Sequence, residues 1–273
     1  MTEEVRNLLN RDGFAVVRDF FDKKIIKNLL SDVEMITKAQ YTHYFSKRKF
    51  PSLEDMLIEI TRKDPKLYLK TLSAIEMLWS ISSIGSAESL INLSKEMGIT
   101  VPNSPVRPAF HTYHFLIAKE LKRNNFYEKT PLHQDWPALR SSFNTLVYWI
   151  PLTKITSRTS RVSLIPGSHK KGLIQAKEHA FGHAIDENTI GNLNGFLSPT
   201  LNVGDVLVFS AFTIHKTHTP KETNDLRFAV GIRHANTLAE EFIREGLPRS
   251  YKIVMDMDRN RALNSEEISQ ISF

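Results

Sequence analysis

The chain has 273 residues, a formal net charge of +6, a pI near 9.4 and no cysteine. Without cysteine there can be no disulfide, thiolate nucleophile or cysteine-ligated metal site, so metal ligands must be histidine, carboxylate or water. No run of about 18 apolar residues predicts a membrane span. The N-terminal segment also lacks the pattern of a secretory signal, so we expect a cytoplasmic protein.

The positive charge is compatible with nucleic acid, an anionic membrane surface or an anionic small substrate as partner. Basic residues are scattered along the chain, and the tightest group is Lys47, Arg48 and Lys49. A nucleic-acid-binding arm usually carries a longer basic block with aromatic residues between the charges. We therefore predict a solvated basic surface, with neither nucleic acid nor a membrane as a partner.

The first part of the chain has helical periodicity after one short strand pattern at residues 13–20. Asp22 is placed to cap a helix over 25–40. Ser52 and Asp55 have the spacing of a capping box in its aspartate form. Residues 66–81 and 88–98 predict two further helices.

After Pro105 short β-rich runs separated by turn residues appear, at 106–118, 143–152, 161–167, 205–215 and 226–234. This pattern is typical of an antiparallel sandwich or barrel and not of alternating β and α units. Residues 167–195 are too long for a hairpin turn and predict a functional loop or lid.

We predict a mainly β fold with N-terminal helices. It is expected to form one domain over 1–273, with a largely helical part over about 1–104, a β core over about 105–235 and an extension over 236–273.

The segment His133-Gln134-Asp135 carries two types of metal ligand two residues apart. Alternate residues of a strand share a face, so His133 and Asp135 would direct a nitrogen and an oxygen to one point. Taken alone, the pair favours the alternative of a surface histidine and a turn aspartate.

A third candidate ligand, His215, ends a strand pattern. A polar turn separates this pattern from the next one, which contains Arg227. In a hairpin centred near Glu222, Thr217 would lie opposite Arg227 on the side that carries His215, and a slip of one residue would break this arrangement. Two histidines and a carboxylate on one face of Fe(II) leave three coordination positions for a 2-oxo acid and O2. Arginine offers the far carboxylate of 2-oxoglutarate a bidentate fork, and a hydroxyl adds a hydrogen bond. The alternatives are an exposed strand arginine and a threonine chosen for β propensity.

Taken in order, GFAVVRDFFD, TPLHQDW, LVYWIPL, RVSLIPGSHK and GDVLVF resemble segments of the phytanoyl-CoA dioxygenase-like (PhyH) family of Fe(II)/2-oxoglutarate oxygenases. The resemblance runs roughly from Gly13 to Arg233. It implies a double-stranded β-helix (a cupin-like jelly roll) that requires Fe(II), 2-oxoglutarate and O2 and releases succinate, CO2 and a hydroxylated product. It implies the metal ligands His133, Asp135 and His215, with Arg227 and Thr217 for 2-oxoglutarate. Pro220 stands where the family usually has asparagine, so Arg233 is the alternative arginine.

The residues around the motif complete the predicted site. Gln134, which resembles the family's glutamine, and Thr130 are predicted to contact 2-oxoglutarate. Their alternatives are a polar strand residue and a turn threonine. Four residues after the motif are predicted to contact substrate, and a solvated loop is the alternative for them: Trp136, Arg140, Ser142 and Asn144. Arg140 would suit an anionic group.

The leading function is hydroxylation of a small molecule, for which the basic charge favours an anion. A cupin-like metalloenzyme that does not use 2-oxoglutarate is the first alternative, and in that enzyme the charge of Arg227 would not matter. A non-catalytic jelly-roll binding module is a second, although such a module has no use for a complete ligand set. A hydroxylase acting on protein or nucleic acid is a third.

Overall fold

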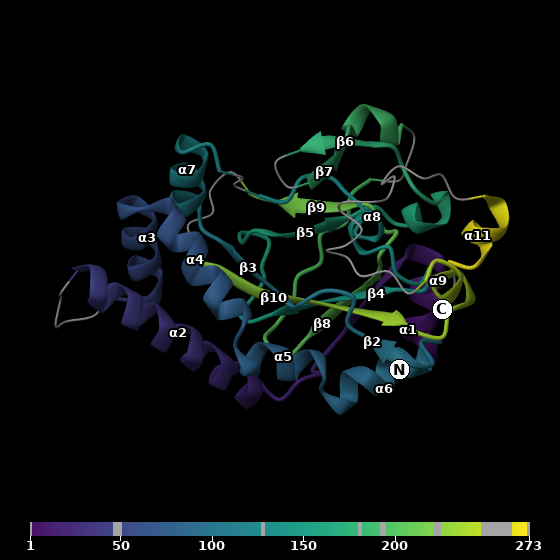
Figure 1. Ribbon diagram of the computed structural model, residues 1–273, viewed down its shortest axis with the longest axis horizontal. Helices are drawn as coiled ribbons and strands as arrows, with labels where there is room; N and C mark the ends of the chain where they lie inside the picture. Colours follow the sequence, from purple (N-terminus) through teal and green to yellow (C-terminus); the bar gives the residue numbers. More distant parts are fainter. Residues whose placement is uncertain are drawn as a thin grey trace.

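The computed structural model describes residues 2–45, 51–126, 129–179, 182–191, 195–220, 225–246 and 264–271. Its centre is an antiparallel main sheet with the strand order β1-β8-β4-β10-β2, and β3 pairs with the first half of β10 (Figure 1). These strands are β1 (Phe14–Val17), β2 (Pro102–Asn103), β3 (Ala109–Tyr113), β4 (Leu146–Pro151), β8 (Val206–Ser210) and β10 (Arg227–Asn236). Two small sheets lie above it in Figure 1, made of β5 (Arg161–Leu164) with β9 (His215–His218) and of β6 (Ala176–His179) with β7 (Gly182–Ile185).

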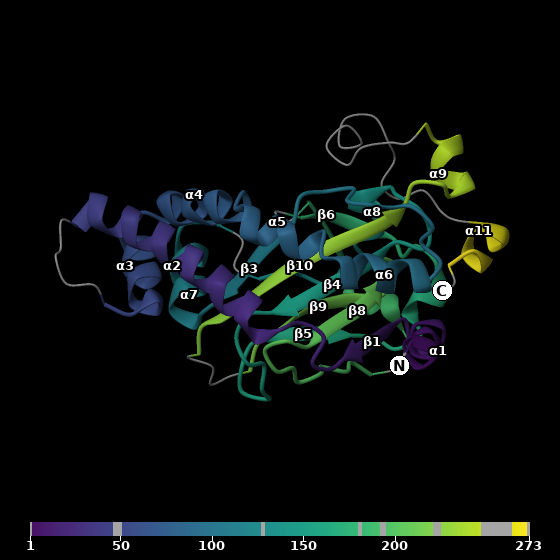
Figure 2. The ribbon, with the colours of Figure 1, turned by 90° about the horizontal axis from the view of Figure 1, so that it is seen from below.

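Helices from the first part of the chain cover the other face of the main sheet (Figure 2). The helices up to residue 123 are α1 (Thr2–Asp12), α2 (Lys23–Phe45), α3 (Leu53–Lys63), α4 (Pro65–Glu76), α5 (Trp79–Gly85), α6 (Glu88–Glu96) and α7 (Phe115–Arg123). Later come α8 (Trp136–Leu139), α9 (Glu240–Arg244), α11 (Ser265–Ser269) and the 3-10 helices η1 (Ser168–Lys171) and η2 (Glu187–Ile190). The predicted N-terminal helices and antiparallel strands are thus confirmed. The description "mainly β" is wrong, because helices occupy more of the described chain than strands do.

Local signals placed the helix starts well. The backbone N–H of Lys24 donates to Asp22 Oδ1 at 2.8 Å, and that of Asp55 donates to Ser52 Oγ at 3.1 Å. One helix prediction and one strand prediction were wrong in extent. The expected helix over 66–81 breaks at Leu78, whose extended backbone turns the buried Ile81 towards the sheet. The expected strand over 106–118 ends at Tyr113, because α7 begins there with His114 as its N-cap.

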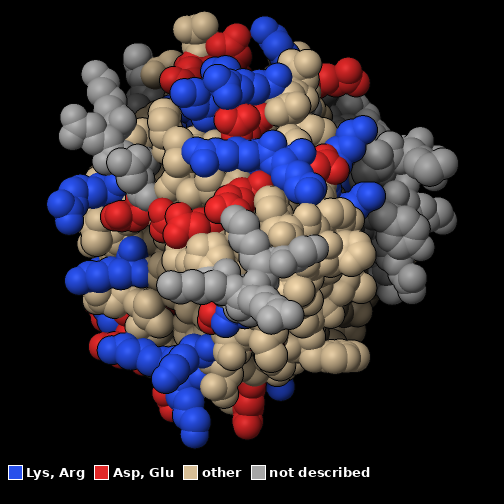
Figure 3. Space-filling view, turned by 90° about the vertical axis from the view of Figure 1, so that its left-hand side faces the viewer, with Lys and Arg blue, Asp and Glu red and all other residues tan. Residues whose placement is uncertain are grey.

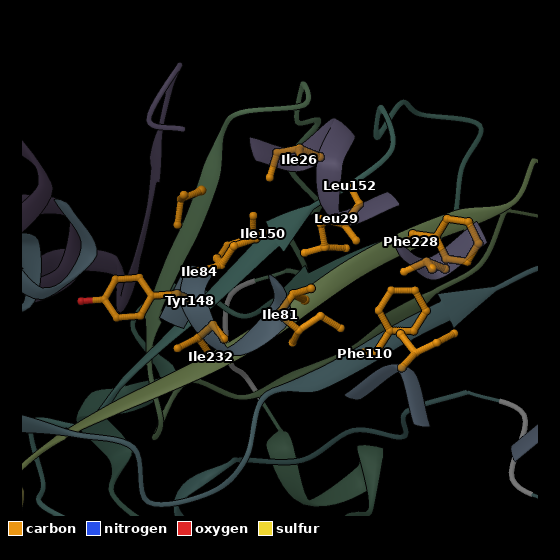
Figure 4. Close-up of a cluster of buried hydrophobic side chains, with 14 of the residues drawn as sticks. Ile26, Leu29, Ile81, Ile84, Phe110, Tyr148, Ile150, Leu152, Phe228 and Ile232 are labelled. Atoms are coloured by element: carbon orange, nitrogen blue, oxygen red, sulfur yellow. The ribbon is translucent and has the colours of Figure 1, made fainter. Parts of the chain in front are cut away.

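Alternate residues of β10 divide between two environments. Phe228, Val230 and Ile232 join the hydrophobic cluster that the N-terminal helices form with the main sheet (Figure 4). Ala229 points the opposite way, into a second cluster with residues of β4, β5 and β8. The inward face of the main sheet therefore looks towards the small sheets, and the inward residues of β10 include Arg227 and Arg233.

One face of the molecule shows how its charged side chains are distributed. On the face shown in Figure 3, basic and acidic side chains are interleaved rather than separated into fields of one sign. No helix within the described ranges is long and apolar enough to cross a bilayer. The basic group at residues 47–49 lies outside the described residues.

Candidate metal centre

His133 and His215 are brought together by backbone pairing. They form an antiparallel bridge in which each backbone N–H donates to the other residue's carbonyl, at 2.9 and 3.0 Å. His215 is the first residue of β9 and lies opposite Leu164 of β5. Directly paired residues place their side chains side by side, and here the two imidazole centroids are 4.1 Å apart.

Asp135 reaches the same point from a different backbone conformation. The sequence predicted a strand through this residue, whereas Asp135 is helical (φ −75, ψ −33) and begins the short helix α8. Its N–H donates to the carbonyl of Ala211 at 2.9 Å, which fixes the segment beside His215. Asp135 Oδ1 lies 3.1 Å from His133 Nε2 and 3.8 Å from His215 Nε2. The three potential ligand atoms all lie within 4.8 Å of one another, and all three residues are buried.

The tautomers of the two histidines follow from their other contacts. His133 Nδ1 lies 2.9 Å from the carbonyl oxygen of Pro131, and His215 Nδ1 lies 2.9 Å from that of Thr213. A carbonyl can only accept, so each Nδ1 carries the proton and each neutral ring has its lone pair on Nε2. With both Nε2 atoms unprotonated, three electron-pair donors converge on one small volume, where a bound metal cation would stabilise them. Two imidazoles and a carboxylate suit Fe(II), and the carbonyls supply the outer support that metal-bound histidines need.

The protonation states agree with this arrangement. Burial, and next the proximity of His133, lowers the pKa of His215 to about 3. Burial would raise the pKa of Asp135, but Arg233, His133 and His215 together hold that pKa well below its usual value. At neutral pH both His215 and Asp135 are therefore in the form that binds a metal.

The predicted hairpin between His215 and Arg227 is wrong. β9 pairs with β5, which places Thr217 opposite Val162. Both edges of β10 are already occupied, by β3 and β4, so β9 cannot pair with it. Thr217 instead donates its backbone N–H to the carbonyl of Thr130 at 3.1 Å, so these two predicted co-substrate contacts are neighbours beside the His133–His215 bridge. Residues 221–224 of the predicted turn lie outside the described residues.

Arg227 opens β10 on its inward face. It is 5% exposed, and its guanidinium carbon lies 5.6 Å from the ring centroid of Trp149. Between Arg227 and Arg233 lies His111, opposite Ala229 in the strand register. Burial first, and then the charges of Arg233 and Arg227, lower the pKa of His111 to about 3. The inward face of β3 and β10 thus holds two guanidinium groups and a neutral imidazole.

Gln134 does not have the geometry of a co-substrate contact. Its side chain is fully buried, and its Nε2 donates to the carbonyls of Gly172 and Phe212, each at 2.7 Å. Its Oε1 accepts the N–H of Ile174 at 2.9 Å. Both ends of the amide are used on backbone groups, so the Gln134 side chain points away from the three ligand atoms.

Three of the four predicted substrate contacts are buried, and Asn144 is partly exposed. The alternative to substrate contact was a solvated loop, whereas α8 turns the chain into the core. Trp136 is 1% exposed, stacks on Phe212 and donates its indole N–H to the carbonyl of Ser141. Arg140 is also 1% exposed, with its guanidinium carbon 5.4 Å from the Trp136 ring. Ser142 Oγ accepts the N–H of Asn236 at 2.8 Å, and Asn144 donates to the carbonyl of Gly98 at 3.1 Å.

The predicted lid over residues 167–195 contains η1, the β6–β7 hairpin and η2. This region is attached to the ligand segment. The N–H of Ile185 donates to the carbonyl of Leu132 at 2.7 Å, and His183 Nε2 lies 3.0 Å from the carbonyl oxygen of Gln134. Together with the side-chain bonds of Gln134, these contacts hold both ends of the hairpin against residues 132–134.

Comparisons with known proteins agree with the motif analysis. The family profile described as phytanoyl-CoA dioxygenase (PhyH) matches residues 9–229. A 1-deoxypentalenic acid 11-beta-hydroxylase of Streptomyces arenae is 38% identical over 98 residues, and that of Streptomyces exfoliatus is 35% identical over 95 residues. Each match covers 32% of this chain and 34% of the relative, so it spans about a third of those relatives' length.

Similar solved structures cover more of the chain at lower identity. EctD from S. alaskensis in its apoform has a TM-score of 0.56 at 13% identity, covering 97% of this chain and 85% of that one. The non-heme alpha ketoglutarate dependent epimerase SnoN from nogalamycin biosynthesis has a TM-score of 0.55 at 15% identity, with coverages of 86% and 83%. The carbocyclase SnoK of the same biosynthesis has a TM-score of 0.53 at 13% identity, with coverages of 98% and 95%. At these identities the likeness concerns the fold.

Proposed function

The chain belongs to the phytanoyl-CoA dioxygenase family, and from this premise we propose that it is a non-haem Fe(II)/2-oxoglutarate-dependent dioxygenase. It hydroxylates a small molecule and releases succinate and CO2. One observation carries the proposal: the lone pairs of His133 and His215 and a carboxylate oxygen of Asp135 converge within 4.8 Å in a buried site. Three buried electron-pair donors this close together are stabilised when they share one bound cation.

The fold proposed is a double-stranded β-helix, or jelly roll. The main sheet and the β5–β9 sheet are then its two facing layers, which share the cluster that contains Trp149, Leu164 and Phe209. Phe209 also packs edge-on against His215, with 4.8 Å between the ring centroids. The layers thus hold the metal ligands between them and limit the access of water.

In the proposed site His133, Asp135 and His215 hold Fe(II). Fe(II) and 2-oxoglutarate together supply an oxidant made from O2. Arg227 anchors the far carboxylate of 2-oxoglutarate, because its buried guanidinium is permanently charged and lies on the inward face of β10. Thr217 lies in β9 and donates its backbone N–H to the carbonyl of Thr130. The hydroxyls of these two neighbours are proposed to contact 2-oxoglutarate. Gln134 is left out because its amide is used on backbone groups.

The substrate is proposed to be a small molecule, as it is for the curated hydroxylases that the chain resembles. The net charge of +6 supports an anionic group on it. Trp136, Arg140 and Ser142 are not proposed as its contacts because they are buried in the core, and Asn144 is not proposed because its side chain binds the carbonyl of Gly98.

Formation of succinate tests the reaction. Wild-type protein with Fe(II), 2-oxoglutarate and O2 should form succinate slowly alone and faster when a screened small molecule is its substrate. His215→Ala and Asp135→Ala should abolish this activity, whereas Arg123→Lys, at an exposed ion pair with Glu120, should retain it. Uptake of O2 without succinate would favour the cupin-like alternative, and a protein that binds no metal would refute the proposal.

A further inference from the structure

A second inward arginine of β10, Arg233, contacts the metal-ligand group directly. It lies opposite Val147 of β4, and its side chain is 14% exposed. Its Nε and Nη2 atoms each lie 3.0 Å from Asp135 Oδ2. Its third nitrogen, Nη1, donates to the carbonyl of Gly231 at 3.3 Å. The guanidinium is thus directed at the carboxylate and fixed to its own strand.

The two oxygens of Asp135 consequently face different partners. Oδ1 faces His133 and His215, at 3.1 and 3.8 Å from their Nε2 atoms. Oδ2 faces away, towards two N–H groups of Arg233. A carboxylate can bind a metal through one oxygen or both, and here the second oxygen is already used.

We propose that Arg233 is a positioning residue that restricts Asp135 to a single bond with the metal. The inference rests on the proposed function, because its consequence concerns the positions left for 2-oxoglutarate and O2. With Asp135 bound through one oxygen, three positions of an octahedral ion stay open. If Asp135 chelated the ion with both oxygens, two positions would remain, and a chelating 2-oxo acid would leave none for O2.

Gly231 has no side chain and so leaves room for the guanidinium of Arg233. A Cβ at this position would lie 2.9 Å from Arg233 Nη1 and 2.7 Å from His111 Nε2. Gly231→Ala therefore displaces these two flexible ends without removing a charge. This substitution tests the position of Arg233 separately from its presence.

The experiment measures co-substrate chelation without oxygen. Wild type and Arg233→Met are saturated with Fe(II) and titrated anaerobically with 2-oxoglutarate or with pyruvate, and the visible charge-transfer band of the chelated 2-oxo acid is followed. Pyruvate chelates in the same way but has no far carboxylate. Nitric oxide is then added as a stand-in for O2, and its binding is followed by electron paramagnetic resonance. In Arg233→Met both acids should still give the band, but nitric oxide should bind the acid-loaded Fe(II) about tenfold or more weakly than in wild type, because the second oxygen of Asp135 takes its position. Arg233→Lys should recover part of the loss, and Gly231→Ala should fall between wild type and Arg233→Met.

Arg227→Lys is the matched control, because it should weaken 2-oxoglutarate and leave pyruvate unchanged. Arg123→Lys controls for the loss of an arginine at an exposed ion pair. If Arg233→Met weakens only 2-oxoglutarate, Arg233 binds the far carboxylate and the proposal is overturned. Unchanged binding of nitric oxide in Arg233→Met also overturns it. A wild type without any band would instead refute the proposed function before the variants are compared.

Discussion

Replacing Gln134 with methionine should destabilise the fold without weakening 2-oxoglutarate binding to the folded protein. The glutamine amide satisfies two buried carbonyls, of Gly172 and Phe212, and one backbone N–H, of Ile174. Methionine fills nearly the same volume but can satisfy none of them. Each buried polar group left unsatisfied costs about 1–3 kcal/mol, so the three together should cost at least about 3 kcal/mol. That is a large share of the roughly 5–15 kcal/mol that stabilises a typical protein.

Urea unfolding followed by circular dichroism measures this loss, and an anaerobic 2-oxoglutarate titration of the Fe(II) protein measures binding. Gln175→Met is the matched control, because Gln175 is an exposed residue of the same region and the substitution should change stability by less than about 0.5 kcal/mol. A Gln134→Met variant with wild-type stability but weaker 2-oxoglutarate binding would refute the reasoning and return Gln134 to the co-substrate site.

Three further outcomes are expected. Gly13→Ala should lower the melting temperature more than Gly98→Ala. Both glycines have positive φ, but a Cβ at Gly13 would lie 2.4 Å from His169 Nδ1, whereas a Cβ at Gly98 would meet nothing within 4 Å. Equal losses in melting temperature would contradict this. Burial, and next the charge of Lys170, lowers the pKa of His169 to about 4. Because His169 gains its proton more easily in the unfolded chain, the free energy of unfolding is unaffected by this group above the unfolded pKa of about 6.5. It falls as pH decreases towards 4, by about 2 kcal/mol between pH 7 and 5. His169→Gln should therefore flatten the pH dependence of urea unfolding, and an unchanged slope would contradict the assignment. Arg227→Lys should raise the KM for 2-oxoglutarate about 10–100-fold with a smaller change in kcat, and an unchanged KM would remove Arg227 from the co-substrate site.

Local signals in the sequence were sufficient for many elements. The capping residues Asp22 and Ser52 act through neighbours two or three positions away, so they could be read directly. The separation of helical and β-rich parts follows in the same way from periodicity. The break at Leu78 was missed because the apolar pattern continues through it, and only packing against the sheet requires the turn.

The ligand set could be anticipated, but not how the chain brings it together. His133 and Asp135 were expected to share a face of a strand, and they converge although Asp135 is helical. The hairpin prediction failed because sequence neighbours need not pair, and β10 finds both its partners elsewhere in the chain. The placement of Gln134 and Trp136 in the core depends on α8, whose four residues carry too short a pattern to read.

Arg233 was named only as an alternative co-substrate arginine. One signal for its position was present: Arg227, Gly231 and Arg233 alternate along a single strand pattern, so they share a face. The contact of Arg233 with Asp135 joins segments far apart in the chain. No spacing within one motif could have predicted it.

The central claim is that His133, Asp135 and His215 hold Fe(II) with positions open for 2-oxoglutarate, and one anaerobic titration tests it most directly. Metal-free protein is titrated with Fe(II) and then with 2-oxoglutarate, in wild type and in His215→Ala. We expect one Fe(II) per chain and a visible charge-transfer band in wild type, and neither in the variant. A His215→Ala protein that binds Fe(II) and develops the same band as wild type would contradict the assignment of the site.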